Sequence, residues 1–182
     1  MKVFPTEVNG VVIVESPTFR DERGFFAEVF HAEKFAALGL PTDFVQDNHS
    51  RSAKGVLRGL HFQRRKPQGK LVRPVQGKIF DVAVDLRQSS STFGKWFGVM
   101  LEEGDGRQVY IPPGLAHGFY VLSESAHVSY KCTTSYHGPS DSSLLWNDAT
   151  VGIEWPIANS ESPLLSSRDQ AAQAFAALAP FP

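Results

Sequence analysis

The chain has 182 residues, 42% of them hydrophobic and 20% charged, with a formal net charge of -1. This length suits one domain, residues 1–182, with a core of its own. The balanced charge argues against nucleic acid as the main partner, since nucleic-acid binding usually brings a basic surplus. No stretch approaches the roughly 20 apolar residues of a membrane span.

Cysteine usage and the N-terminal residues indicate the compartment. Cys132 is the only cysteine, so an internal disulfide is excluded and a reducing environment is favoured. The apolar run Val11–Val14 is shorter than the core of a signal peptide. We therefore expect a cytoplasmic protein without a membrane partner.

Short β-like runs separated by Gly, Pro, Asn and Asp dominate the first 155 residues. In chain order they are Val11–Val14, Phe25–Phe30, Val56–Phe62, Leu71–Val75, Lys78–Leu86, Trp96–Leu101, Gln108–Ile111, Gly118–Leu122, Val128–Thr133 and Gly152–Trp155. Within Lys78–Leu86 every second residue from Phe80 onward is apolar, which predicts a strand with one face in a core. Many short strands indicate an all-β sandwich or jelly roll.

Two segments have helical character. Ala32–Leu38 is short and stops at Gly39, a residue suited to a helix C-terminus. Arg168–Ala179 is Ala-rich and ended by Pro180, and Ser166 with Asp169 three residues later resembles a capping box. We therefore expect short peripheral helices, including a C-terminal helix.

The segment Gly55–Gln63 is the richest in potential chemistry. It places Arg58 and His61 in an apolar strand, and Lys70 follows closely. Residues three apart on a regular strand face opposite sides, but a bulge at Gly59 would re-aim one of them. The ordinary interpretation is a core histidine with two solvated charges; the cluster as a whole favours function.

A second stretch runs from Gly106 through Pro112 and Gly114 to His117, and would aim His117 at a barrel mouth. Its spacing resembles the second motif of the cupin superfamily, and Gly55 with His61 satisfies the start of the first. Metal-binding cupins use His-x-His, a Glu and a further His. Here those positions read His61, Gln63, Gln68 and His117, which is a poor ligand set for a divalent cation. We predict no metal, which leaves the histidines for proton chemistry.

Further polar and aromatic residues have two interpretations each. Tyr130 and Tyr136 are ordinary strand tyrosines unless the hydroxyl of Tyr130 faces the cavity of His61. Asp169 is a helix-capping residue, or it holds the second nitrogen of His61. The remaining candidates are Phe19, Arg20, Arg23, Glu28, Gln46, Asp47 and Asn48. In the ordinary interpretation they are solvated or turn residues, and in the functional one they contact a phosphate, a base or a ribose.

Six motifs in order give the chain a close resemblance to the dTDP-4-dehydrorhamnose 3,5-epimerase family of cupins, from about Val11 to Asp169. They are Arg-Asp-Glu-Arg-Gly-Phe-Phe at 20–26, Gly-Val-Leu-Arg-Gly-Leu-His-Phe-Gln at 55–63, Gln-Gly-Lys-Leu-Val-Arg at 68–73, Phe-Asp-Val-Ala-Val-Asp-Leu-Arg at 80–87, Ile-Pro-Pro-Gly-Leu-Ala-His-Gly-Phe at 111–119 and Trp-Asn-Asp at 146–148. The resemblance implies a single cupin-like jelly-roll epimerase domain. It also implies a homodimer with exchanged N-terminal strands, in which Phe19 and Arg23 contact the nucleotide in the partner's cavity.

The resemblance also implies roles for individual residues. His61 matches the base, Tyr130 the acid on the opposite sugar face, and Asp169 the acid that pairs with the histidine. Tyr136 matches the ring that stacks on thymine. Substrate contacts match Arg23, Glu28, Gln46, Asn48, Arg58, Lys70 and His117, and also Asp141, where Glu is common, and Arg168, where Lys is common.

These roles imply a metal-independent reaction on a dTDP-4-keto-6-deoxy sugar, in dTDP-L-rhamnose or related deoxysugar biosynthesis. The C4 ketone acidifies C3 and C5, His61 takes the proton, and Lys70 stabilises the enolate. No cofactor is expected, because the ketone already exists in the substrate. The rival hypotheses are an epimerase acting at C3 only or C5 only, a 3,4-ketoisomerase, and a non-catalytic sugar-nucleotide-binding cupin.

Overall fold

Two antiparallel sheets packed face to face form the body of the protein in the computed structural model, which describes residues 1–158, 160–179 and 181. The first sheet contains β1 (Lys2–Pro5), β2 (Val12–Glu15), β10 (Arg107–Ile111), β7 (Lys70–Gln76), β12 (Ser125–Cys132) and β5 (Gln46–Ala53), in that order. The second contains β13 (Asp141–Ser143), β6 (Leu57–Gln63), β11 (Leu115–Val121), β8 (Lys78–Asp85) and β9 (Trp96–Glu102). This arrangement confirms the predicted cupin-type jelly roll.

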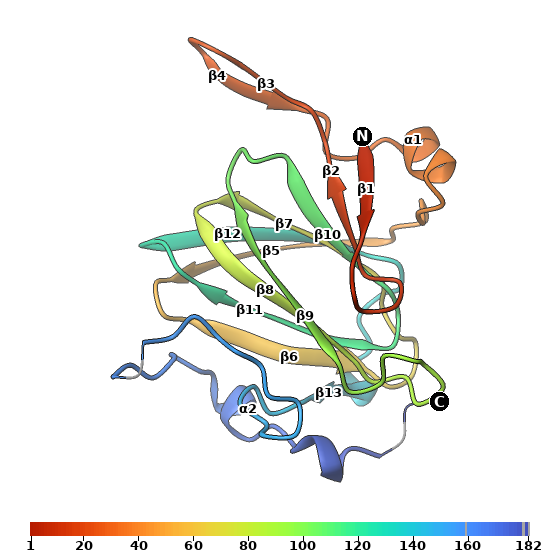
Figure 1. Cartoon of the computed structure of the whole chain (residues 1–182), viewed down its shortest axis with the longest axis vertical. Coiled ribbons are helices and arrows are strands. Elements are labelled where there is room, and N and C mark those ends of the chain that lie inside the picture. Colours follow the sequence, from red (N-terminus) through yellow and green to blue (C-terminus); the bar gives the residue numbers. More distant parts are fainter. Residues whose placement is uncertain (159, 180, 182) are drawn as a thin grey trace.

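A separate hairpin, β3 (Thr18–Asp21) with β4 (Gly24–Ala27), extends away from both sheets at the N-terminal end of the molecule (Figure 1). The helices are short and peripheral: α1 (Ala32–Ala37) beside β1, and α2 (Ser167–Gln170) beneath β6 and β13. Two 3-10 turns cover Gly138–Ser140 and Phe175–Ala177. No helix among the described residues has the length and apolar character needed to cross a membrane.

The interior strand β8 shows why the sandwich is stable. Its alternate residues Ile79 and Ala83 pack into the core between the sheets. The other alternating series, which includes Phe80, Val82 and Val84, packs on the opposite side against the C-terminal segment. The predicted strand is confirmed, but the expectation of only one buried face is wrong, because the C-terminal segment covers the second face. Each fully buried aliphatic side chain of this kind contributes about 1.5–3 kcal/mol.

The predicted C-terminal helix over Arg168–Ala179 is too long. Its start is correct, since the backbone N–H of Asp169 donates to the Ser166 hydroxyl at 3.2 Å, but α2 ends at Gln170. Beyond it, the carbonyl of Gln173 accepts from Leu145, and Asp148 accepts from the backbone N–H of Phe175. These tertiary bonds override the helix propensity of the alanines. Pro180, the expected helix terminator, lies outside the described residues.

Other boundaries differ at a few places. The helix before Gly39 is confirmed, with φ of 73° at that glycine. Gly152–Trp155 forms no strand, and Phe25–Phe30 is extended only to Ala27. The strand predictions missed β1, β3, β5 and β13. Strand β5 reads Gln-Asp-Asn-His-Ser-Arg-Ser-Ala, and a strand without large apolar residues shows no hydrophobic alternation.

Candidate active site

One cavity of about 350 Å³ opens between the two sheets. Its walls come from β5, β6, β7, β11, β12 and β13, with one residue from α2. The lining residues are Gln46, Asn48, Ser50, Arg58, His61, Phe62, Gln63, Gln68, Lys70, His117, Phe119, Tyr130, Tyr136, Asp141 and Arg168. Ten of the fifteen predicted site residues therefore lie in one place.

A bulge in β6 brings Arg58 and His61 to the same face. His61 pairs with His117 on β11 and Arg58 pairs with Phe119, so three steps along β6 match two along β11. The bulge falls where it was predicted, at Gly59, whose φ is +135°. A Cβ atom there would lie 2.6 Å from the Cα of Gly118, so the close approach of the two strands requires glycine.

His61 forms a histidine–aspartate pair with Asp169. Its Nε2 lies 2.5 Å from Oδ1 of Asp169, which is almost fully buried. Burial lowers the pKa of His61 despite the opposing hydrogen bond from Asp169. Burial alone would raise the pKa of Asp169, but the hydrogen bonds from His61 and Ser166 and neighbouring positive charge together outweigh it, so the net pKa is lowered. A neutral imidazole that donates from Nε2 to a carboxylate leaves Nδ1 as its free basic nitrogen.

Lys70 brings a buried cation to the same region. It is 8% exposed, and its Nζ donates to the backbone oxygen of His61 at 3.3 Å. Among the described residues no carboxylate forms an ion pair with it. Burial lowers its pKa. An ammonium group with spare donors next to His61 is suited to binding an oxyanion.

Tyr130 lies on β12 of the first sheet, whereas His61 lies on β6 of the second. Burial raises the pKa of Tyr130, which keeps its hydroxyl protonated and able to donate. Its ring centroid is 6.4 Å from that of His117, and His117 in turn bonds to Asp81 at 2.8 Å. The imidazole of His61 and the hydroxyl-bearing ring of Tyr130 therefore line the cavity from opposite sheets.

The rim of the cavity carries three connected side chains. The hydroxyl of Tyr136 donates to Asp141 at 3.0 Å, and its ring is largely exposed. The guanidinium of Arg168 grips the same carboxylate, with Nη1 at 2.7 Å from Oδ2. Asp141 and Arg168 were expected to contact substrate; here they bind each other. The exposed Tyr136 ring is available for stacking.

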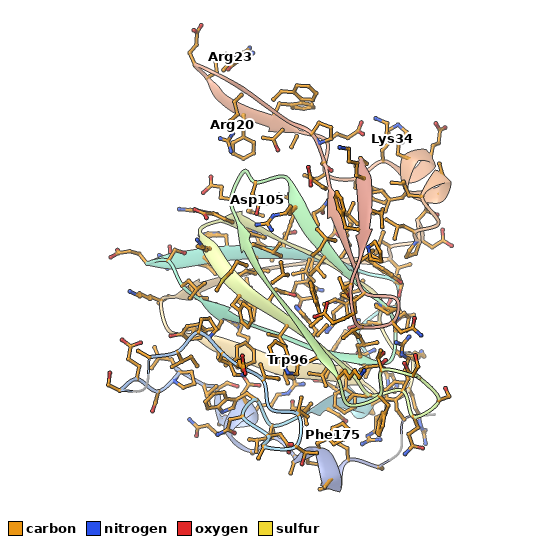
Figure 2. All side chains as sticks on the ribbon, viewed as in Figure 1. Arg20, Arg23, Lys34, Trp96, Asp105 and Phe175 are labelled. Carbon is orange, nitrogen blue, oxygen red and sulfur yellow. The ribbon has the colours of Figure 1, made fainter. Side chains whose placement is uncertain are left out.

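Five predicted residues are absent from the cavity lining. Asp169 is one of them and contacts the lining residue His61, whereas the other four, all described in the structure, have no such contact. Phe19 and Arg23 are on the projecting hairpin, and Figure 2 shows Arg23 at its tip, directed away from the sheets. Arg23 pairs with Asp21, and Glu28 pairs with Lys34. Asp47 lies between Gln46 and Asn48 on β5 and forms an ion pair with Lys131. Strand alternation directs neighbours to opposite faces, so this chain does not bring that carboxylate into its own cavity.

The side chains of the two glutamines at the cupin metal positions donate hydrogen bonds to backbone oxygens. Gln63 donates to the oxygen of Lys66, and Gln68 donates to the oxygen of Thr134, both at 2.8 Å. No group of three or more His, Cys, Asp or Glu side chains among the described residues is placed to hold a metal. Metal-independence itself stays a prediction.

Ser50 and Phe119 line the cavity but were not among the predicted site residues. Within the described part of the chain, the buried Oγ of Ser50 has no hydrogen-bond partner. A buried hydroxyl without a partner is costly, and because Ser50 also lines the cavity it is a candidate contact for a bound molecule. The available signal was alternation, because Ser50 continues the series of Gln46 and Asn48 along β5.

Comparison with known proteins gives consistent matches. A family model described as dTDP-4-dehydrorhamnose 3,5-epimerase matches residues 5–177. The dTDP-4-dehydrorhamnose 3,5-epimerase of Salmonella typhimurium is 53% identical over 174 residues, covering 94% of this chain and 94% of that protein. A crystal structure of dTDP-6-deoxy-D-glucose-3,5-epimerase from Legionella pneumophila, in complex with dTDP-4-keto-L-rhamnose, is 47% identical with a TM-score of 0.93, covering 98% of this chain and 94% of that one. A 3'-monoepimerase from Streptomyces bikiniensis, in complex with dTDP-quinovose, is 34% identical with a TM-score of 0.87, covering 94% of this chain and 87% of that one.

Proposed function

The chain belongs to the dTDP-4-dehydrorhamnose 3,5-epimerase family, and from this premise we propose that it inverts C3 and C5 of dTDP-4-keto-6-deoxy-D-glucose. The observation that carries the proposal is the pairing of His61 with Asp169 on one sheet side of the cavity and the presence of Tyr130 on the other. The chemistry needs no redox cofactor, since the ketone is already in the substrate.

His61 acts as the base in this proposal. A carbon next to the C4 ketone gives its proton to Nδ1, and the electron pair of the broken C–H bond forms a C=C bond while charge moves to the C4 oxygen. Lys70, buried beside the base, stabilises that oxygen. Asp169 stabilises the imidazolium that forms on His61.

Tyr130 completes each inversion. Its hydroxyl gives a proton to the same carbon from the opposite face, so the C–H bond reforms with inverted configuration. His61 then holds one proton more and Tyr130 one fewer, and exchange with solvent restores both. The raised pKa of Tyr130 keeps the donor loaded before each cycle.

The nucleotide half of the substrate is assigned to the exposed end of the cavity. The ring of Tyr136 offers a face for the thymine, and its backbone N–H is fixed by Gln46 at 2.7 Å. Arg58 donates from Nε to the Ser52 hydroxyl at 2.8 Å and from Nη2 to the backbone oxygen of Arg51 at 3.5 Å, and we assign its Nη1 group to the diphosphate. Asn48 and His117 remain proposed sugar contacts because both line the cavity.

The test is to incubate the wild-type protein with dTDP-4-keto-6-deoxyglucose in deuterated water and read C3 and C5 by NMR. Deuterium at both carbons with the inverted product supports the 3,5-epimerase. Deuterium at C3 alone with an inverted C3 assigns a monoepimerase, as the Streptomyces bikiniensis relative is named. A carbonyl moved from C4 to C3 assigns a ketoisomerase, and binding without any exchange assigns a non-catalytic protein. His61→Ala should abolish exchange at both carbons, and near-normal exchange in this variant contradicts the assignment of the base.

We infer further that the active form is a homodimer that exchanges its N-terminal hairpins. The hairpin carries three exposed aromatic residues, Phe19, Phe25 and Phe26, at 66%, 46% and 68% exposure. Large apolar side chains displayed together mark a contact surface. Insertion into the partner would cover them and bring Phe19 and Arg23 to the partner's nucleotide. A cytoplasmic location is part of the same proposal, since Cys132 is unpaired.

Subunit mixing tests the exchange. His61→Ala and Arg23→Ala homodimers should each have little activity. In a mixed dimer, the intact cavity of one chain meets the intact hairpin of the other, so random mixing should restore about a quarter of wild-type activity. No recovery, with mixed dimers demonstrated by mass spectrometry, would show that Arg23 does not act across the interface.

A further inference from the structure

Two consecutive residues of α2 reach two neighbouring strands of the second sheet. Asp169 bonds to His61 on β6. Arg168 bonds to β13, which pairs with β6 in antiparallel register. The catalytic carboxylate and its neighbouring cation are therefore attached side by side.

The attachment of Arg168 is multidentate. Nη1 lies 2.7 Å from Oδ2 of Asp141, and Nη2 donates to Oδ1 at 2.8 Å. Nε donates to the hydroxyl of Ser143 at 3.0 Å, and Ser143 is the register partner of His61. A planar guanidinium that binds a carboxylate with two nitrogens fixes direction as well as distance.

The helix that carries these residues needs such an attachment. It has four residues, Ser167–Gln170, and a helix of one turn is not stable alone. Among its described side chains, only those of Arg168 and Asp169 make hydrogen bonds or ion pairs to the two sheets. Backbone pairing of Leu164 with Val56 before α2, and of Gln173 with Leu144 after it, anchors the chain on either side of the helix. The bonds of Arg168 add a side-chain contact that holds α2 itself against β13.

We propose that Arg168, held by Asp141 and Ser143, is a positioning residue that orients Asp169 against Nε2 of His61. It acts through α2 and not by contact with the reacting carbons. The kinetic part of this proposal rests on the proposed epimerase function, whereas the orientation of His61 can be measured without substrate.

Arg168 also acts on His61 through its charge. Burial is the main cause of the lowered pKa of His61, and the positive charge of Arg168 lowers it further. Loss of that charge should raise the pKa of His61. The acid limb of the kcat/KM profile should then move to higher pH, because the base becomes protonated earlier on acidification.

Three variants separate geometry from charge. Arg168→Gln removes both, Arg168→Lys keeps the charge but loses the fork, and Asp141→Asn keeps Arg168 but removes its carboxylate anchor. We expect Arg168→Gln to lower kcat for exchange about tenfold or more, because misplacing a catalytic group by about 1 Å can cost about a hundredfold in rate. KM should change little, and the acid limb should shift upward. Arg168→Lys should lower kcat without that pH shift.

The matched control is Arg107→Gln, which breaks the similar ion pair between Arg107 and Asp105, neither of which lines the cavity, and should leave the kinetics unchanged. A raised KM with unchanged kcat and pH profile in Arg168→Gln would assign Arg168 to substrate binding and overturn the proposal. Unchanged kcat, KM and pH profile would overturn it equally. Should Arg168→Gln fail to fold, Arg168→Lys and Asp141→Asn carry the same test.

A substrate-free measurement distinguishes this proposal from the proposed function. Imidazole 15N NMR of the free protein reports the tautomer and pKa of His61. The wild type should show Nε2 protonated, and Arg168→Gln should show a raised pKa and a mixed tautomer. This result would support the positioning role even if the wild type failed to exchange substrate protons. An identical His61 spectrum in both proteins would refute it.

Discussion

Asp169→Asn removes the negative charge next to His61 while keeping the size of the side chain. The carboxylate oxygen lies 2.5 Å from Nε2 in a nearly fully buried position. When His61 takes a proton, its new charge is attracted to this carboxylate by about 4 kcal/mol, for charge centres about 4 Å apart and an effective dielectric constant of about 20. Each 1.36 kcal/mol corresponds to about a tenfold change in rate. The expected loss in kcat is therefore about a thousandfold.

The amide also disturbs the tautomer, since its NH2 group would donate to Nε2 and leave the proton on Nδ1, the nitrogen required as the base. The assay is single-carbon deuterium incorporation at C3, followed by NMR with saturating substrate. Thermal unfolding checks that the variant remains folded, because Asp169 also accepts a hydrogen bond from the Ser166 hydroxyl. A folded Asp169→Asn protein that loses less than about tenfold in kcat would refute the assigned role, since the Coulomb attraction would then supply under about 1.4 kcal/mol.

Four further predictions concern pH, the acid, the unpaired hydroxyl and metal. Because burial lowers the pKa of His61 below its ordinary 6.5, kcat/KM should fall on acidification with a midpoint below 6.5, and a midpoint clearly above it would contradict a neutral buried base. Tyr130→Phe should retain deuterium exchange better than net inversion, since His61 can return the proton to its own face; equal losses in the two NMR readouts would mean that Tyr130 is not simply the second-face acid. Ser50→Ala should weaken substrate binding roughly two- to tenfold, with the unliganded protein as stable as the wild type or more so, because a hydroxyl without a partner is lost. Titration calorimetry and thermal unfolding measure both effects, and unchanged affinity would remove Ser50 from the substrate contacts. Prolonged dialysis against a chelator should leave kcat unchanged, and restoration of lost activity by an added divalent cation would defeat the metal-independent mechanism.

Much of the fold and site could be predicted from local sequence, because hydrophobic alternation, glycine positions and short motifs are visible in it. The alternation in Lys78–Leu86 gave β8, and the glycine between Arg58 and His61 gave the bulge that puts both in the cavity. The family resemblance implied that His61, Lys70 and Tyr130 share one site, and all three line the same cavity despite their separation in the chain.

What could not be predicted depends on contacts distant in sequence. Strand β5 faces a polar cavity, so its inward residues, including Ser50, are hydrophilic and no hydrophobic period appears. The alanines after Gln170 favour a helix locally, but pairing of Gln173 with Leu144 and Leu145 replaces it. The mutual pairing of Asp141 and Arg168 is likewise invisible in sequence, because 27 positions separate them.

The contact between Gly59 and Gly118 has a consequence for the evolution and engineering of this site. The strands that carry His61 and His117 touch at two glycines, where neither strand has a side chain. The direction of His61 is therefore set by the backbone of β6 and not by the choice of a side-chain rotamer. Any single replacement at either glycine would push β6 away from β11 and redirect the base. Variation that changes sugar specificity should therefore accumulate on β5 and around the rim, where side chains can be exchanged without moving the proton-transfer groups.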